Sequence, residues 1–79
     1  YSINIRGHTD NIPIKTKQFP SNWELSSIRA TNLLRYLIDQ GVDPMRLTAT
    51  GYADLIPISK NNNATNRAKN RRVEFMLKR

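Results

Sequence analysis

The sequence of 79 residues contains no cysteine and one histidine, His8. Without cysteine there is no disulfide framework and no thiolate metal ligand, and a single imidazole excludes a metal site built from several histidines of one chain. The chain has no serine-nucleophile motif and no pair of carboxylates spaced for hydrolysis. We therefore expect a protein without metal, cofactor or catalytic residues, in which His8 packs or caps rather than reacts.

Long apolar runs are also missing. The most apolar stretch, residues 33–38, is interrupted by Arg35, and no run approaches the roughly 20 residues that cross a bilayer. The first residues do not resemble a signal peptide, and Tyr1 already belongs to an alternating strand pattern. We expect residues 1–79 to form one small domain and to be a fragment of a longer protein.

Acidic residues are few, six against thirteen lysines and arginines, and the net charge is +7. This excess is compatible with nucleic acid, anionic lipid or an acidic polymer as partner. Several cations gather near the C-terminus, namely Arg67, Lys69, Arg71, Arg72, Lys78 and Arg79. Because the chain lacks the aromatic pair of an RNA-recognition sheet and a GXXG loop, we predict no nucleic-acid partner.

Apolar and polar residues alternate in three segments, which predicts strands at residues 1–6, 47–52 and 73–78, with Gly7 ending the first. Ser21-Asn22-Trp23-Glu24 fits a capping box and predicts a helix from Asn22 to about Gln40, stopped by a left-handed Gly41. A second, short helix is expected at residues 64–70. The long helix between the first two strands favours parallel pairing with a right-handed crossover.

The predicted fold is an α/β (α+β) two-layer sandwich of the order β-α-β-(α)-β, with the long helix on one sheet face. The apolar stripe of this helix comprises Trp23, Ala30, Leu33, Leu34 and Leu37. We expect Trp23 to lie in the core rather than to serve as a platform for a sugar. Ser26 and Ser27 are small enough to let the helix approach a neighbour closely.

Two opposite charges stand out in this β-α unit. Asp10 follows the first strand, and Arg29, expected to be partly shielded, lies about two turns into the helix. Spacing alone favours either a structural salt bridge between them or two unrelated surface charges. The alternative is a receptor for a ligand carrying both an ammonium and a carboxylate, because Arg29 presents a planar fork to a carboxylate and Asp10 accepts from an ammonium.

Seven short motifs occur in a fixed order along nearly the whole chain. They are Gly7-His8-Thr9-Asp10, Asn22-x-x-Leu25-Ser26-x-x-Arg29-Ala30, Leu37 with Gly41, Arg46-Leu47, Gly51-Tyr52, Pro57 and Asn70-Arg71-Arg72-Val73-Glu74. In these motifs the chain resembles the OmpA-like peptidoglycan-binding domains. The extended loop 11–20 and the segment 21–26 resemble the MotB branch, the stator subunits that anchor the flagellar motor to the cell wall.

The resemblance implies non-catalytic binding of peptidoglycan, in which Asp10 and Arg29 grip the diaminopimelate of the stem peptide. Asn22, Arg71 and Thr9 match or border other positions of the ligand pocket. It also implies a MotA-like membrane partner, a homodimer and a periplasmic or otherwise extracytoplasmic domain of a cytoplasmic-membrane protein. The family fold begins with a strand and a helix that this chain lacks.

Three alternatives remain open. The domain could anchor an envelope component outside the motor, as OmpA and Pal relatives do. It could be a protein-interaction module that uses the long helix and the basic cluster, or a wall hydrolase that uses His8.

Overall fold

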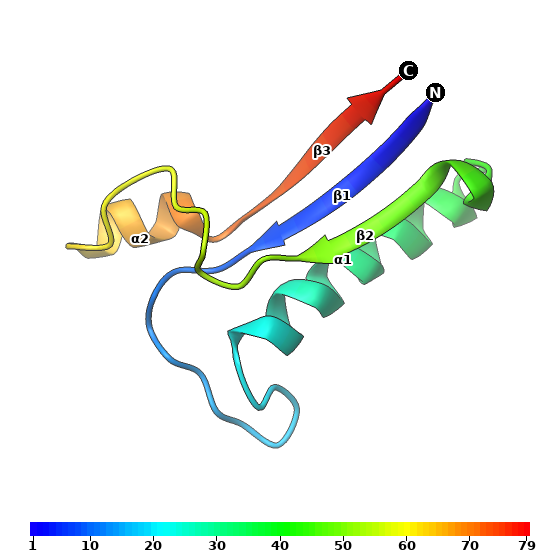
Figure 1. Cartoon of the computed structure of the whole chain (residues 1–79). Helices are drawn as coiled ribbons and strands as arrows, with labels where there is room; N and C mark the ends of the chain where they lie inside the picture. Colours follow the sequence, from blue (N-terminus) through cyan, green and yellow to red (C-terminus); the bar gives the residue numbers. More distant parts are fainter.

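The computed structural model describes all residues, 1–79, as a three-stranded sheet with two α-helices (Figure 1). The elements are β1 (Ser2–His8), α1 (Asn22–Asp39), the 3-10 turn η1 (Pro44–Arg46), β2 (Leu47–Gly51), α2 (Ala64–Asn70) and β3 (Arg72–Lys78). The predicted α/β fold and its β-α-β-(α)-β order are confirmed. Neither helix combines the length and the apolar character needed to span a membrane.

The sheet has the strand order β2-β1-β3, with β1 parallel to β2 and antiparallel to β3. The predicted parallel pairing across α1 is therefore correct. Helix α1 packs along β1 and β2, whereas β3 lies beyond it (Figure 1). Phe75 and Leu77 of β3 pair with Ile5 and Ile3 and share their face, yet they stay 53% and 66% exposed because α1 does not reach them.

Both ends of α1 are capped at the predicted residues, although the bonds between Ser21 and Glu24 differ from those of a capping box. The Ser21 hydroxyl accepts from the Trp23 amide at 3.2 Å and donates to Glu24 Oε1 at 2.6 Å. Gly41, with φ of 98°, donates to the Ile38 carbonyl, and the next amide donates to the Leu37 carbonyl, which is the Schellman pattern.

Strand β1 and helix α1 approach closely because glycine and serine meet at their contact. A Cβ on Gly7 would lie 2.1 Å from the Ser26 carbonyl oxygen, and one on Gly51 would lie 2.2 Å from Ser27 Oγ. The sequence-based end of the first strand at Gly7 is wrong by one residue, since pairing continues to His8. Gly7 is required for helix packing and not for a turn.

The buried apolar core is small and consists of Ile5, Ala30, Leu47 and Ala53. Trp23, predicted to belong to it, is 49% exposed. The reason is its place on α1: Ser26 and Ser27 already face Gly7 and Gly51 near the ends of β1 and β2, so Trp23, one turn earlier, extends past the sheet.

Candidate functional site

A cavity of about 270 Å³ lies where the carboxyl end of β1, the first turns of α1 and the start of β3 meet. All five predicted site residues line it. The complete lining is Thr9, Asp10, Ile12, Pro13, Ile14, Asn22, Leu25, Arg29 and Arg71. The structure therefore brings the candidate residues from three separate sequence motifs to one place.

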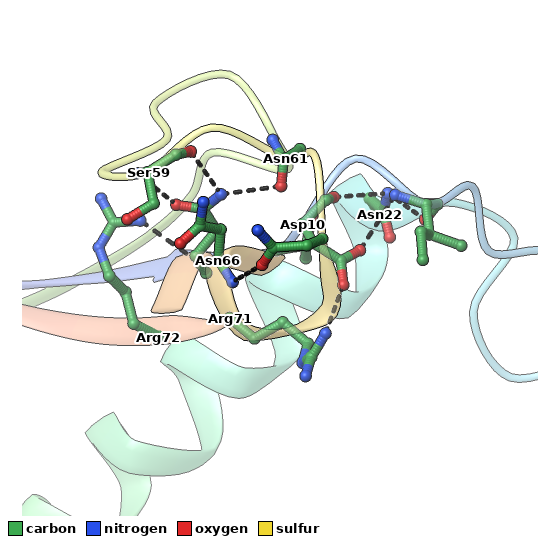
Figure 2. Close-up of polar contacts among 11 residues, drawn as sticks. Asp10, Asn22, Ser59, Asn61, Asn66, Arg71 and Arg72 are labelled. Atoms are coloured by element: carbon green, nitrogen blue, oxygen red, sulfur yellow. Dashed lines mark hydrogen bonds and ion pairs between the residues drawn. The ribbon is translucent and has the colours of Figure 1, made fainter. Parts of the chain in front are cut away.

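Within this cavity Asp10 is paired with Arg71 and not with Arg29. Arg71 Nη1 lies 2.6 Å from Asp10 Oδ2, and the other carboxylate oxygen accepts the Ile12 amide at 3.0 Å (Figure 2). The Asp10 side chain is 10% exposed and the Arg71 side chain 45%. A mostly buried anion thus meets a cation that still faces solvent on one side.

Arg29 lines the same cavity without an ion pair. The three ion pairs of the chain are His8–Glu74, Asp10–Arg71 and Arg72–Glu74. Of the two arrangements that spacing favoured, the salt bridge between Asp10 and Arg29 is therefore wrong, and so is the expected shielding of Arg29, which is exposed. Its guanidinium makes no hydrogen bond or ion pair within the chain, so it can accept an anion from outside.

Asn22 and Thr9 hold the loop that carries Asp10. Asn22 Nδ2 donates to the Ile12 carbonyl at 3.1 Å and to the Asp10 carbonyl at 3.4 Å (Figure 2). The Thr9 hydroxyl donates to the Asp10 carbonyl at 2.9 Å. Because Asn22 opens α1, these bonds tie the start of the helix to the end of β1 and position the carboxylate between them.

The apolar wall of the cavity was not identified from the sequence. Ile12, Pro13 and Ile14 of the loop and Leu25 of α1 line the space between the charged groups. The signal that could have found it is the run Ile12-Pro13-Ile14 directly after Asp10, since a loop seldom carries apolar residues without something to cover them. The lining is suited to a ligand with methylene groups between its charges.

Arg71 is held in place by its buried neighbour Asn70. Asn70 Oδ1 accepts from the amides of Ile58 and Ser59 at 2.9 and 3.1 Å. Its Nδ2 donates to the Ser59 carbonyl and to Asn61 Oδ1 at 2.9 and 2.8 Å (Figure 2). A fully bonded amide thus fixes the end of α2, and Arg71, the only residue between α2 and β3, is aimed at the cavity.

His8 is packed, as expected, with 1% of its surface exposed. Its ring stacks on Tyr52 with centroids 5.3 Å apart, and Nε2 lies 2.9 Å from Glu74 Oε1. Nδ1 is buried without a hydrogen-bond partner. Burial and, second, the Arg72 guanidinium lower the pKa of His8 below 6.5, whereas the hydrogen bond from Arg72 lowers the pKa of Glu74 below 4.5.

The motifs that build this cavity belong to a known family. The family model described as "OmpA family" matches residues 1–71. The chain belongs to the OmpA family. Motility protein B of Bacillus subtilis is 46% identical over 77 residues, which cover 96% of this chain and 30% of that protein.

Two solved structures share the fold. The periplasmic domain of Helicobacter pylori MotB (residues 90–256) superimposes with a TM-score of 0.84 at 40% identity, over 94% of this chain and 46% of that one. The T6SS cell wall anchor of Pseudomonas aeruginosa superimposes with a TM-score of 0.88 at 43% identity, over 94% and 52%. The chain thus spans about half of each of these two structures and 30% of the B. subtilis relative.

Proposed function

We propose that the cavity binds peptidoglycan by ionic capture of the diaminopimelate in its stem peptide. Arg29 takes the side-chain carboxylate of diaminopimelate, and Asp10 accepts hydrogen bonds from the neighbouring ammonium. The observation that carries this proposal is the pairing pattern: Asp10 has a partner within the chain, whereas Arg29, on the same cavity, has none.

The remaining lining fits the rest of such a ligand. Ile12, Ile14 and Leu25 offer an apolar wall to the methylene groups between the two charged ends of diaminopimelate. Arg71, half exposed beside Asp10, provides a second cation for the ligand carboxylate. Arg29, Arg71 and Asp10 together carry a net charge of +1, which favours an anionic group over a simple amine.

Binding in this proposal makes and breaks no covalent bond, so the domain is an anchor and not an enzyme. Its place is outside the cytoplasm, where the wall is. An anchor requires a long-lived attachment, and a single shallow cavity binds weakly. A homodimer on a polymeric wall increases the attachment through multivalency, because the second site binds at a high effective concentration.

The parent protein we propose is a MotB-type stator subunit that fixes the flagellar motor to the wall, with a MotA-like partner in the membrane. The identity to Motility protein B and the loop of residues 11–20 support this branch. A second candidate is an anchor for another envelope machine, supported by the comparable likeness to the T6SS cell wall anchor. Restored swimming of a stator-deficient strain by a chimera carrying residues 1–79 favours the first candidate, and wall binding without motility favours the second.

Co-sedimentation with purified cell wall tests the binding residues. Arg29→Ala and Asp10→Ala should each remove most of the bound fraction while circular dichroism stays unchanged. Arg35→Ala, on the same helix as Arg29, and Asp39→Ala, which removes an exposed carboxylate of that helix, are the controls, because neither residue lines the cavity. Wall binding retained by both folded cavity variants contradicts the proposed site.

A further inference from the structure

The charged residues of segment 55–73 are all positive. Acidic residues stand only at its borders, as Asp54 before it and Glu74 after it. A stretch with cations and no anions attracts negatively charged partners. The five cations of the segment are Lys60, Arg67, Lys69, Arg71 and Arg72.

Three of these five cations have no partner inside the chain. The other two, Arg71 and Arg72, form ion pairs with Asp10 and Glu74. The remaining three make no ion pair and donate no side-chain hydrogen bond, and the two lysines among them are exposed while the arginine is half-buried. These cations, which an anion from outside can reach, are Lys60, Arg67 and Lys69.

The same segment exposes three large aliphatic side chains next to one another. Leu55 is 63% exposed, Ile56 46% and Ile58 59%. A single exposed aliphatic residue is common in soluble proteins, but several together mark a surface that contacts an apolar partner. The segment therefore combines free cations with apolar side chains that gain free energy when they leave water.

Hydrogen bonds join the loop that carries these aliphatic residues to helix α2. The Ile58 amide donates to Asn70 Oδ1 at 2.9 Å, and Arg72 Nη2 donates to the Ile56 carbonyl at 2.9 Å. The resulting loop–α2 unit, residues 55–70, stands at the end of the sheet opposite the two chain termini and apart from α1 (Figure 1). Its position leaves it accessible to a large surface.

We infer that the loop–α2 unit docks on an anionic phospholipid surface. Its free cations lie against the lipid phosphates, and the aliphatic residues enter the boundary between headgroups and acyl chains. A soluble polyanion would neutralise the same cations but would leave the aliphatic side chains in water, so the combination favours a lipid surface. None of these residues lines the cavity that contains Arg29, and lipid docking is therefore separate from the proposed wall binding.

Co-sedimentation with vesicles tests the electrostatic part of this inference. The wild type should bind phosphatidylcholine vesicles that contain about 30% phosphatidylglycerol, and should not bind vesicles of phosphatidylcholine alone. The double variant Lys60→Gln/Lys69→Gln should bind about tenfold or more weakly, because each cation near an anionic membrane contributes to the affinity. Lys15→Gln/Lys17→Gln removes the same charge from exposed positions of loop 11–20 and should have little effect.

A second variant tests the aliphatic part. Leu55→Ser/Ile58→Ser should reduce vesicle binding by about tenfold, because less apolar surface enters the membrane. The same variant should bind polyphosphate, a soluble polyanion, as the wild type does. Met45→Ser is the control, since Met45 is 91% exposed in η1 and should not contact the membrane. Circular dichroism establishes that each variant is folded.

Three results overturn lipid docking. The first is equal wild-type binding to the two kinds of vesicle, or to neither. The second is vesicle binding that is undiminished in folded Leu55→Ser/Ile58→Ser, which would indicate a site for soluble polyanions. The third is an equal loss in the two lysine double variants, which would indicate attraction by net charge alone. Cell-wall binding should be unchanged in all these variants, so failure of lipid docking leaves the proposed function standing.

Discussion

Arg71 Nη1 lies 2.6 Å from Asp10 Oδ2, although the two residues are 61 positions apart in the sequence. They meet because β1 and β3 are antiparallel neighbours, which brings the start of β3 beside the end of β1. This ion pair leaves Arg29 as the one charged side chain of the cavity without a partner. Asp10 already has a cation, so Arg29 is the side chain that most needs an anion from outside.

Replacing Arg71 should weaken ligand binding without unfolding the domain. Arg71→Ala removes a charged hydrogen-bond donor from the cavity, and an affinity loss of about tenfold for a diaminopimelate muropeptide is expected. Because the Arg71 side chain is 45% exposed, the melting temperature should change little. Calorimetric titration and a thermal melt measure the two quantities. Unchanged or tighter binding would show that Arg71 only competes with the ligand for Asp10.

A methyl group on Gly7 should disrupt the packing of α1 on the sheet. The added Cβ would lie 2.1 Å from a backbone oxygen of Ser26, which cannot move without shifting the helix. We expect Gly7→Ala to lower the free energy of unfolding by about 3 kcal/mol or more. Gly41→Ala is the comparison: nothing lies near its Cβ, and only a positive φ opposes it, so about 1 kcal/mol is expected. Denaturant titration of both variants would refute this account if Gly41→Ala were the more harmful.

Asn70 should matter more for stability than any exposed asparagine. Asn70→Ala leaves two part-buried amides and one carbonyl of the loop at Ile58 and Ser59 without their partners. The expected loss is about 2–4 kcal/mol, measured by denaturant titration. Asn66→Ala, whose side chain bonds only Asn62, is the control and should cost much less. Equal effects would mean that the Asn70 bonds contribute little.

Acidification should destabilise the fold through His8 and Glu74. The folded-state pKa of His8 is lowered by burial, so its contribution is present above pH 6.5 and is lost as the pH falls below that value. The pKa of Glu74 is also lowered, so its contribution is lost below about pH 4.5. The melting temperature should therefore fall from pH 8 to pH 5. In His8→Gln the melting temperature should depend less on pH between pH 7 and pH 5. A wild-type melt that is flat over this interval would contradict the packing described for His8.

The helix ends and the strands could be predicted from the sequence, because each depends on residues that are close together along the chain. The Ser21 cap, the Gly41 stop and the alternating strands each follow from a few adjacent positions. The same holds for the parallel pair β1–β2, since a single long helix connects the two strands. The local pattern could not predict the partner of Asp10. That partner, Arg71, comes near the carboxylate only when the chain has folded and β3 lies beside β1.

The two errors on α1 have a common physical cause. Helical periodicity gives the direction of a side chain around the axis but not how far the neighbouring sheet extends along it. Trp23 belongs to the apolar stripe of α1 and is still 49% exposed, and Arg29, which flanks that stripe, is exposed as well. Both errors concern residues that line cavities of the chain.

The most direct test of the central claim exploits the chemistry of the ligand. A stem peptide with lysine in place of diaminopimelate keeps the ammonium but lacks the side-chain carboxylate assigned to Arg29. Calorimetric titration should show that the wild type prefers the diaminopimelate peptide by about 10- to 100-fold, and that Arg29→Ala binds both peptides with equal, weak affinity. Equal affinity of the wild type for the two peptides, or an undiminished preference in folded Arg29→Ala, would contradict ionic capture by Arg29.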